Sequence, residues 1–137
     1  GRLITNAGEG RTAYVARADC AAVAAAVLTT DGHDGKAYDI TSADALNAAD
    51  VAALFSELSG RAVEPVYLTD DEWIATMVEH AGMPEPLAQV IATFGIAARQ
   101  GYMGAVSTTV EELTGAAPVS VRAVVEARRE ELVGTPA

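Results

Sequence analysis

One cysteine is present among 137 residues, and several other residue classes are also scarce. The lone Cys20 excludes an intrachain disulfide framework and a zinc site built from several cysteines. The densest apolar run, residues 20–28, is far shorter than the roughly 20 residues that a membrane-spanning helix needs. The first residues have no signal-peptide pattern. We therefore expect a soluble, cytoplasmic protein that does not cross a membrane.

Positive charge is scarce as well, because 9 Lys and Arg face 19 Asp and Glu. The resulting net charge of −10 argues against a nucleic-acid partner or an anionic membrane, since phosphate binding needs clustered basic side chains. Aromatic residues make up only 5% of the chain, whereas half of it is hydrophobic and 29 residues are alanine. The length fits one domain, with a core of Ala, Val, Leu and Ile carried mainly by helices.

Three segments are typical of strands, namely residues 12–16, 36–41 and 62–68. Pro65 indicates that the third of them lies at a sheet edge. Six further segments have the apolar spacing of helices, and most begin at a capping residue or proline and end before a glycine. These helices are expected at about 20–30, 48–59, 70–81, 84–99, 109–114 and 121–132. The sequence thus predicts an α/β protein with at most three strands and about six helices.

The second helix has the clearest local signals. Asn47 with Asp50 is typical of a capped helix start. The buried face of the helix is expected to consist of Val51, Leu54, Phe55 and Leu58.

Two other polar patterns are also interpreted as caps rather than as sites. Thr69 with Glu72 forms a capping-box pattern for the third helix. Asp19 is expected to cap the first helix, with Arg17 as a local ion-pair partner.

Residues 8–13 match the spacing G-x-G-x-x-G/A of dinucleotide-binding loops. Such a loop follows a strand and leads into a helix, whose N-terminus binds the pyrophosphate. Here a strand is expected after the glycines instead. We therefore interpret the segment as a glycine turn and assign no cofactor-binding residue.

No catalytic or metal-binding group stands out among the remaining polar residues. His33 lies in a polar turn, and His80 lies in the last turn of a helix, where a protonated imidazole is favoured. Neither belongs to a His/Cys cluster, and Cys20 in its alanine-rich helix is interpreted as a small buried hydrophobe. We assign no catalytic residue and no metal.

Phe94, Tyr102 and Met103 flank a glycine-interrupted stretch. Aromatic and Met side chains beside a flexible glycine loop are suited to line an apolar ligand pocket. Ordinary core packing is the alternative interpretation of these three residues, and it stays open.

Several short motifs occur in a defined order along the chain. They are Arg17/Asp19/Ala21 at a helix start, the segment 32–40, Ser59-Gly60-Arg61, Thr69 to Glu72, Gly82-Met83-Pro84, and the segment 112–118. Each motif is weak alone, but their order resembles the C-terminal half of NmrA-like, atypical short-chain dehydrogenases. Among these, the chain most resembles the type 2 NAD(P)H:quinone oxidoreductases.

The resemblance implies a Rossmann-type, NAD(P)-binding fold in which residues 1–137 form a single substrate-binding portion without a complete dinucleotide-binding domain. The family's phosphate loop and catalytic positions would precede residue 1. NAD(P)H is therefore implied as the cofactor but is not expected to bind this chain alone. The implied activity is reduction of a quinone or similar apolar carbonyl compound, with Phe94, Tyr102 and Met103 against the substrate. Alone, the chain is expected to be inactive.

Some NmrA-like proteins resemble these enzymes in fold but act as regulators. Whether the chain serves an enzyme is therefore left open, and the alternative is a non-enzymatic regulatory or protein-interaction module. The implied partners are a small apolar substrate and either a second copy of the chain or a nucleotide-binding half. Segment 36–41 would extend the sheet of that half, whereas 12–16 and 62–68 would pair in a smaller sheet.

Overall fold

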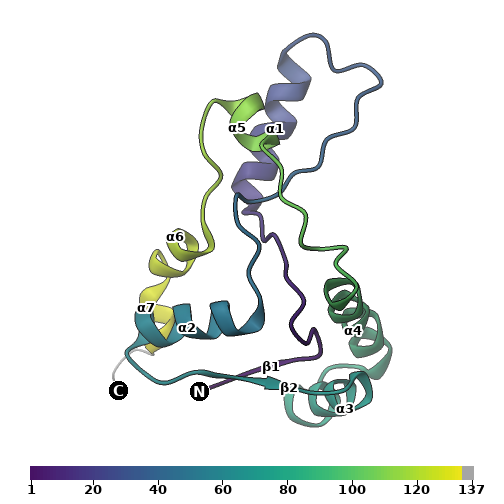
Figure 1. Cartoon of the computed structure of the whole chain (residues 1–137), viewed down its shortest axis with the longest axis vertical. Coiled ribbons are helices and arrows are strands. Elements are labelled where there is room, and N and C mark those ends of the chain that lie inside the picture. The colour runs from purple at the N-terminus through teal and green to yellow at the C-terminus, as the bar shows by residue number, and fades with distance from the viewer. Residues whose placement is uncertain (134–137) are drawn as a thin grey trace. The chain divides into compact units, whose positions relative to one another are not determined.

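A computed structural model describes residues 1–133 of the chain as an α/β structure with more helices than strands (Figure 1). The strands are β1 (Arg2–Thr5) and β2 (Glu64–Tyr67). The helices are α1 (Arg17–Thr29), α2 (Ala48–Ser59), α3 (Asp70–Ala81), α4 (Glu85–Arg99), α5 (Thr109–Thr114), α6 (Val121–Glu126) and α7 (Arg129–Val133). None of these helices is long and apolar enough to span a membrane.

The described residues divide into two compact units. The first unit comprises residues 1–12 and 46–104, and it holds both strands with α2, α3 and α4. The second unit comprises residues 13–45 and 105–133, and it holds α1, α5, α6 and α7.

The sheet of the first unit consists of β1 and β2, which run parallel with Thr5 opposite Tyr67. Parallel strands need a crossover between them, and α2 lies on this crossover and contacts both strands. The prediction of a strand within 62–68 is confirmed, but β1 was not predicted. The predicted strand at 12–16 is wrong, because only Thr12 pairs, in an isolated antiparallel bridge with Leu46.

The predicted start and end of α2 are confirmed. Asn47 and Asp50 form a complete capping box, and Gly60 ends the helix in the left-handed conformation. Leu54 and Leu58 are buried as expected. Val51 and Phe55 are only half-buried, so their expected place in the core is not what the structure shows.

The core of the first unit lies between α3 and α4. Trp73 packs there with Ala88 and Ala92, and Ile4 of β1 packs against this cluster. Two of the three buried side chains are alanines of α4, and their small size suits close packing of α4 against α3. The core of this unit thus contains one Trp, which packs with two alanines and with larger apolar side chains such as Ile4 and Met77.

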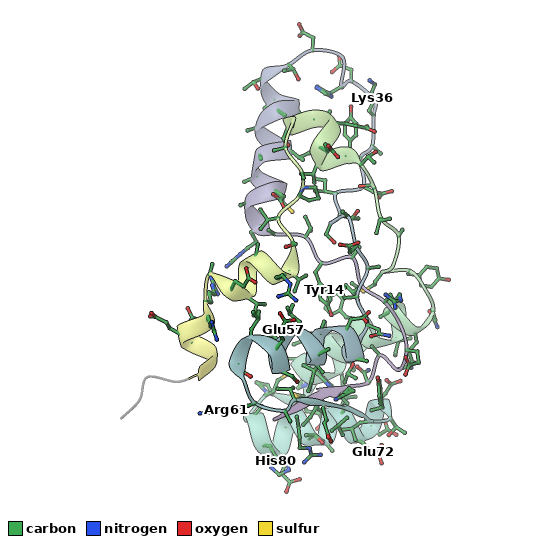
Figure 2. All side chains as sticks on the ribbon, turned by 60° about the vertical axis from the view of Figure 1, so that its left-hand side comes forward. Tyr14, Lys36, Glu57, Arg61, Glu72 and His80 are labelled. Atoms are coloured by element: carbon green, nitrogen blue, oxygen red, sulfur yellow. The ribbon has the colours of Figure 1, made fainter. Side chains whose placement is uncertain are left out.

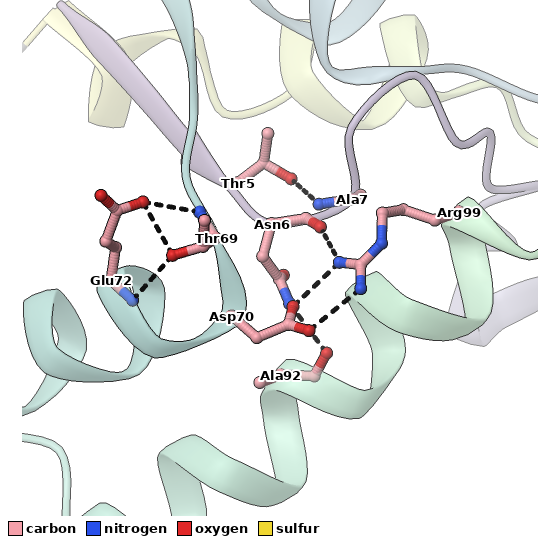
Figure 3. Close-up of polar contacts among 8 residues, drawn as sticks. All are labelled: Thr5, Asn6, Ala7, Thr69, Asp70, Glu72, Ala92 and Arg99. Carbon is pink, nitrogen blue, oxygen red and sulfur yellow. Dashed lines mark hydrogen bonds and ion pairs between the residues drawn. The ribbon is translucent and has the colours of Figure 1, made fainter.

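Both ends of α3 agree with the sequence. The Thr69 hydroxyl accepts the Glu72 N–H, and the Glu72 carboxylate accepts the Thr69 N–H at 2.8 Å, as Figure 3 shows. The Thr69 N–H, followed by the Thr69 hydroxyl that donates to the same carboxylate oxygen at 2.8 Å, lowers the pKa of Glu72. Glu72 and His80 are labelled near the two ends of the helix in Figure 2, and His80 lies in its last turn.

In the second unit, α1 packs against α5, and Val23 and Val110 are buried. The predicted cap of α1 is wrong, since the helix begins at Arg17 and Asp19 lies within its first turn. Asp19 is buried, and its Oδ2 accepts the Val119 N–H at 2.8 Å. The carboxylate therefore holds a distant segment of the chain, and within the described residues Arg17 makes no ion pair.

The predicted strand at 36–41 is absent from the structure. A strand needs a partner for its backbone groups, and none of the residues described here forms a ladder with this segment. Instead, the Ser107 hydroxyl donates to the Asp39 carbonyl at 2.6 Å, and the Ser107 N–H donates to the Thr41 hydroxyl at 2.7 Å. Tyr38 hydrogen-bonds Nδ1 of His33 at 2.7 Å.

The last predicted helix is divided into α6 and α7, with a break at residues 127–128. Its start is confirmed, because the Ser120 hydroxyl accepts the Ala123 N–H at 3.1 Å.

Thr69 and Thr108, which both occupy N-cap positions, provide a test of the helix starts. Thr69→Ala removes a side-chain cap and should lower the free energy of unfolding by about 1 kcal/mol. Thr108 also occupies an N-cap position but makes no capping bond, so Thr108→Ala should cost only a few tenths of a kcal/mol. Urea denaturation of both variants measures the difference. Equal losses would contradict the assigned role of Thr69.

Candidate functional site at the carboxyl ends of the strands

The carboxyl ends of β1 and β2 lie at the same edge of the sheet, because the strands are parallel and in register. In α/β proteins, ligands bind outside this edge. Asn6 follows β1 directly, and Asp70 begins α3 shortly after β2. The residues that meet at this edge therefore form the candidate site.

Asn6 is buried, and both N–H groups of its side-chain amide donate hydrogen bonds. Its Nδ2 donates to Oδ1 of Asp70 at 2.7 Å and to the carbonyl of Ala92 at 2.9 Å (Figure 3). α4 passes so close that a Cβ on Gly95 would clash with the Asn6 side chain. The glycine is thus required by the close approach of α4 to the end of β1.

Arg99, at the end of α4, completes this network. Its two terminal nitrogens donate to the two carboxylate oxygens of Asp70 at 2.8 and 3.0 Å, and Nη1 also donates to the carbonyl of Asn6 (Figure 3). The hydrogen bonds from Arg99, and then from Asn6, lower the pKa of Asp70 to about 2. Asp70 raises the pKa of Arg99 in return. The three residues hold together the ends of β1, α3 and α4.

An open depression of about 490 Å³ lies beside Arg99. It is lined by residues 9–11, Ala98, Arg99, Gly101 and Gly104. We call it the glycine-lined depression. Its volume falls within the range of small-molecule sites. Arg11 at its rim forms an ion pair with Asp50 at 3.1 Å.

Tyr67 and Glu9 meet at the same edge of the sheet. Desolvation, followed by the charge of the nearby Glu9 carboxylate, raises the pKa of Tyr67. The side chain of Tyr67 remains 43% exposed. The edge thus carries a neutral hydroxyl and charged groups that are suited to bind a polar atom of a small ligand.

The glycine motif of residues 8–13 lies in a turn rather than directly before a helix. A strand, β1, precedes it rather than following it as predicted, but the next helix begins only at Arg17. The Gly10 N–H donates to the Ala7 carbonyl at 2.9 Å, and a Cβ on Gly10 would clash with the backbone of Ala98. Gly10 is therefore required for packing, and its N–H is already bonded within the turn.

The three residues predicted to line a substrate pocket differ in position. Phe94 is 57% exposed on α4, which excludes core packing for it, and it does not line the depression. Tyr102 is 78% exposed and Met103 is half-buried, and both lie between the two lining glycines, Gly101 and Gly104. Their contact with a substrate stays a prediction.

The sequence analysis missed the Asn6–Asp70–Arg99 network. Asp70 was placed correctly in the first turn of a helix, but nothing local indicates that its partners are 64 and 29 positions away. Among residues 1–133, no group of three or more His, Cys, Asp or Glu is arranged to hold a metal ion.

Comparison with known proteins shows that the chain matches the C-terminal part of NAD(P)H-dependent reductases. It is 38% identical over 108 residues to NAD(P)H azoreductase of Xenophilus azovorans, and 33% identical over 115 residues to quinone oxidoreductase 2 of Escherichia coli. These matches cover 79% and 84% of the chain but 37% and 40% of the relatives. The chain thus spans about two fifths of their length. No family model matches it.

Solved structures of NAD(P)H-dependent reductases match this chain as well. The NADPH complex of an Escherichia coli NADPH-dependent quinone oxidoreductase superposes with a TM-score of 0.89 and 30% identity, covering 93% of this chain and 45% of that one. The NADP(H) complex of Citrobacter sp. triphenylmethane reductase gives 0.86 and 31%, covering 93% and 44%. The resemblance to the C-terminal part of NmrA-like reductases is confirmed, and these homologues bind NAD(P)H.

The ion pair of Asp70 with Arg99 generates a pH-dependent prediction. Because the folded pKa of Asp70, about 2, lies below its ordinary value of 3.8, the pair stabilises the fold at neutral pH, and this contribution is lost as the pH falls towards 2. Asp70→Asn should therefore lower the free energy of unfolding at pH 7. The deficit relative to the unmodified chain should shrink between about pH 5 and pH 2.

Asp71→Asn is the matched control, because exposed Asp71 lies in the same first turn but outside the network. This variant loses only the favourable interaction of a first-turn carboxylate with the helix dipole, and it leaves the ion pair intact. Urea denaturation at several pH values measures both variants, and a deficit for Asp70→Asn no larger than that of Asp71→Asn would disprove the role of the pair.

Proposed function

We propose that this chain is the substrate-binding portion of an NAD(P)H-dependent reductase that acts on a quinone or a similar apolar carbonyl compound. The observation that carries the proposal is the juxtaposition of exposed Tyr102 with the glycine-lined depression at the carboxyl edge of the sheet. An aromatic side chain left open to solvent beside a concave site with a few polar groups is typical of small-molecule binding.

In this proposal the nicotinamide supplies hydride, and the residues of this chain bind and orient the substrate. Tyr102 and Met103, with Phe94 from α4, cover the apolar part of the substrate and exclude water. Arg99 and its partners fix the polar edge. The cytoplasm is the proposed location.

The chain alone should show no NAD(P)H oxidoreductase activity, because its glycine turn does not lie directly before a helix. Calorimetric titration with NADH and NADPH, together with a quinone-reduction assay, measures this. Micromolar binding of a dinucleotide with quinone turnover would show that these 137 residues contain a working cofactor site.

A specific observation favours a second candidate, a protein-interaction module. Leu87, Val90 and Phe94 are 48%, 59% and 57% exposed and share one face of α4 at spacings of three and four residues. Exposed apolar patches of this kind also serve as protein contacts. A quinone that perturbs Tyr102 favours the reductase portion, whereas a partner protein that covers Val90 without any quinone binding favours the module.

We also expect the chain to associate with another polypeptide, because of features of the second unit. In the described part of the chain, the N–H groups of Tyr38 and Ile40 have no hydrogen-bond partner, and Leu28 of α1 is 84% exposed. Unpaired backbone beside apolar side chains favours pairing with another chain. The net charge of −10 opposes this only weakly at physiological salt, where screening acts within about 8 Å.

Sedimentation velocity at several concentrations should therefore reveal a homo-oligomer, or a complex with a nucleotide-binding polypeptide when one is added. Amide exchange at Tyr38 and Ile40 should slow on association. A monomer at all concentrations in which these two amides are already protected would contradict this expectation.

A further inference from the structure

Four of the seven residues that line the glycine-lined depression are glycine or alanine, and the other three are Glu9, Arg11 and Arg99. Gly10, Gly101, Gly104 and Ala98 contribute no atom beyond a single Cβ. A surface of this kind lets a ligand approach the main chain closely. A flat ring suits it better than a branched aliphatic group, which would leave gaps.

Two of the three lining glycines are explained by the fold. A Cβ on Gly10 would clash with the backbone of Ala98, and Gly101 has a φ of +84°, which side chains other than glycine rarely adopt. Gly104 has neither constraint. Its φ is not positive, and an added Cβ would lie 3.4 Å from the Arg11 carbonyl oxygen and 3.6 Å from the Arg11 Cβ, which are ordinary contacts. The fold therefore accommodates a Cβ at Gly104, and this glycine borders the depression.

Arg99 is one of three charged residues that line the depression, together with Glu9 and Arg11. A guanidinium has five N–H donors, and Arg99 makes three hydrogen bonds, to Asn6 and to both oxygens of Asp70. Two N–H donors therefore have no partner among the residues that the structure describes. Asp70 holds the guanidinium in place, and the side chain is 37% exposed. A partly exposed, oriented cation with donors to spare is suited to bind a carbonyl oxygen.

We propose that the glycine-lined depression binds a flat aromatic carbonyl compound, with the ring against Gly104 and a carbonyl oxygen accepting an N–H of Arg99. The ligand class rests on the proposed function, whereas the position and the roles of Gly104 and Arg99 rest on the geometry. In this proposal the Asn6–Asp70–Arg99 network has two roles. It joins the ends of β1, α3 and α4, and it orients the Arg99 N–H towards the carbonyl oxygen of the ligand.

The test uses duroquinone, a tetramethylated benzoquinone without a free ring position for attack by the thiol of Cys20. Durene, the hydrocarbon with the same four methyl groups and no carbonyl, is the comparison ligand. Titration of the ¹⁵N-labelled chain should shift the amides of Gly101 and Gly104 with saturation. Gly104→Leu should weaken duroquinone binding by roughly tenfold or more without changing the thermal midpoint, because the side chain occupies the ring site.

Two further variants distinguish ligand binding in the depression from nonspecific effects of a substitution. Ala53→Leu adds comparable bulk at an exposed position on α2, outside the depression, and should leave the Kd within about twofold. Arg99→Lys should weaken duroquinone binding by roughly tenfold but leave durene nearly unchanged, because only the quinone accepts the N–H. A purely structural role of Arg99 would weaken both ligands equally.

The proposal is overturned if Gly104→Leu binds duroquinone normally, if the shifts lie elsewhere, or if Arg99→Lys weakens both ligands alike. Its failure is separable from failure of the proposed function. Quinone reduction by the chain joined to a nucleotide-binding half, without shifts at Gly104, would overturn this site alone. Duroquinone bound at Gly104 without reduction in that assembly would support the site and overturn the reductase.

Discussion

The first unit depends on one ion pair that three segments share. Arg99 and Asp70 neutralise each other, and Asn6 spans the space between Asp70 and the carbonyl of Ala92. Each group satisfies a neighbour that would otherwise be left with an unpaired polar atom, which is costly in a partly buried place. The end of α4 is thereby fixed against the turn after β1. Residues next to both segments line the glycine-lined depression.

Local signals predicted the helices well because capping chemistry acts within one turn. Asn47 with Asp50 and Thr69 with Glu72 form the bonds that their spacing indicates, and the glycines at positions 60, 82 and 115 end helices in the left-handed conformation. The strands were predicted less well, since pairing depends on distant residues. β1 is only four residues long, and segment 36–41 has strand-like composition without a partner in the described chain.

The candidate site was only partly predictable for the same reason. The glycine-interrupted stretch around Tyr102 and Met103 was visible in the sequence, and it borders the depression. Asp19 shows how a local interpretation fails, because its carboxylate bonds to Val119, 100 residues away, and does not cap its own helix. Asp70 is similar, since its main partner is at the far end of α4. Such contacts follow from packing, which a single sequence does not reveal.

The isolated bridge of Thr12 with Leu46 has a consequence for how the chain is assembled. The two residues exchange both backbone hydrogen bonds, at 2.9 and 3.0 Å, so the first unit is closed on itself where residues 13–45 leave and return. In chain order, residues 13–45 are therefore an insertion between Thr12 and Leu46, which lie side by side. Residues from 105 onward follow the first unit in the sequence. Insertions at such points change length at small entropic expense, because loop-closure entropy grows only slowly with loop length. The first unit therefore has the connectivity of a host that tolerates replacement of its insert by a short turn.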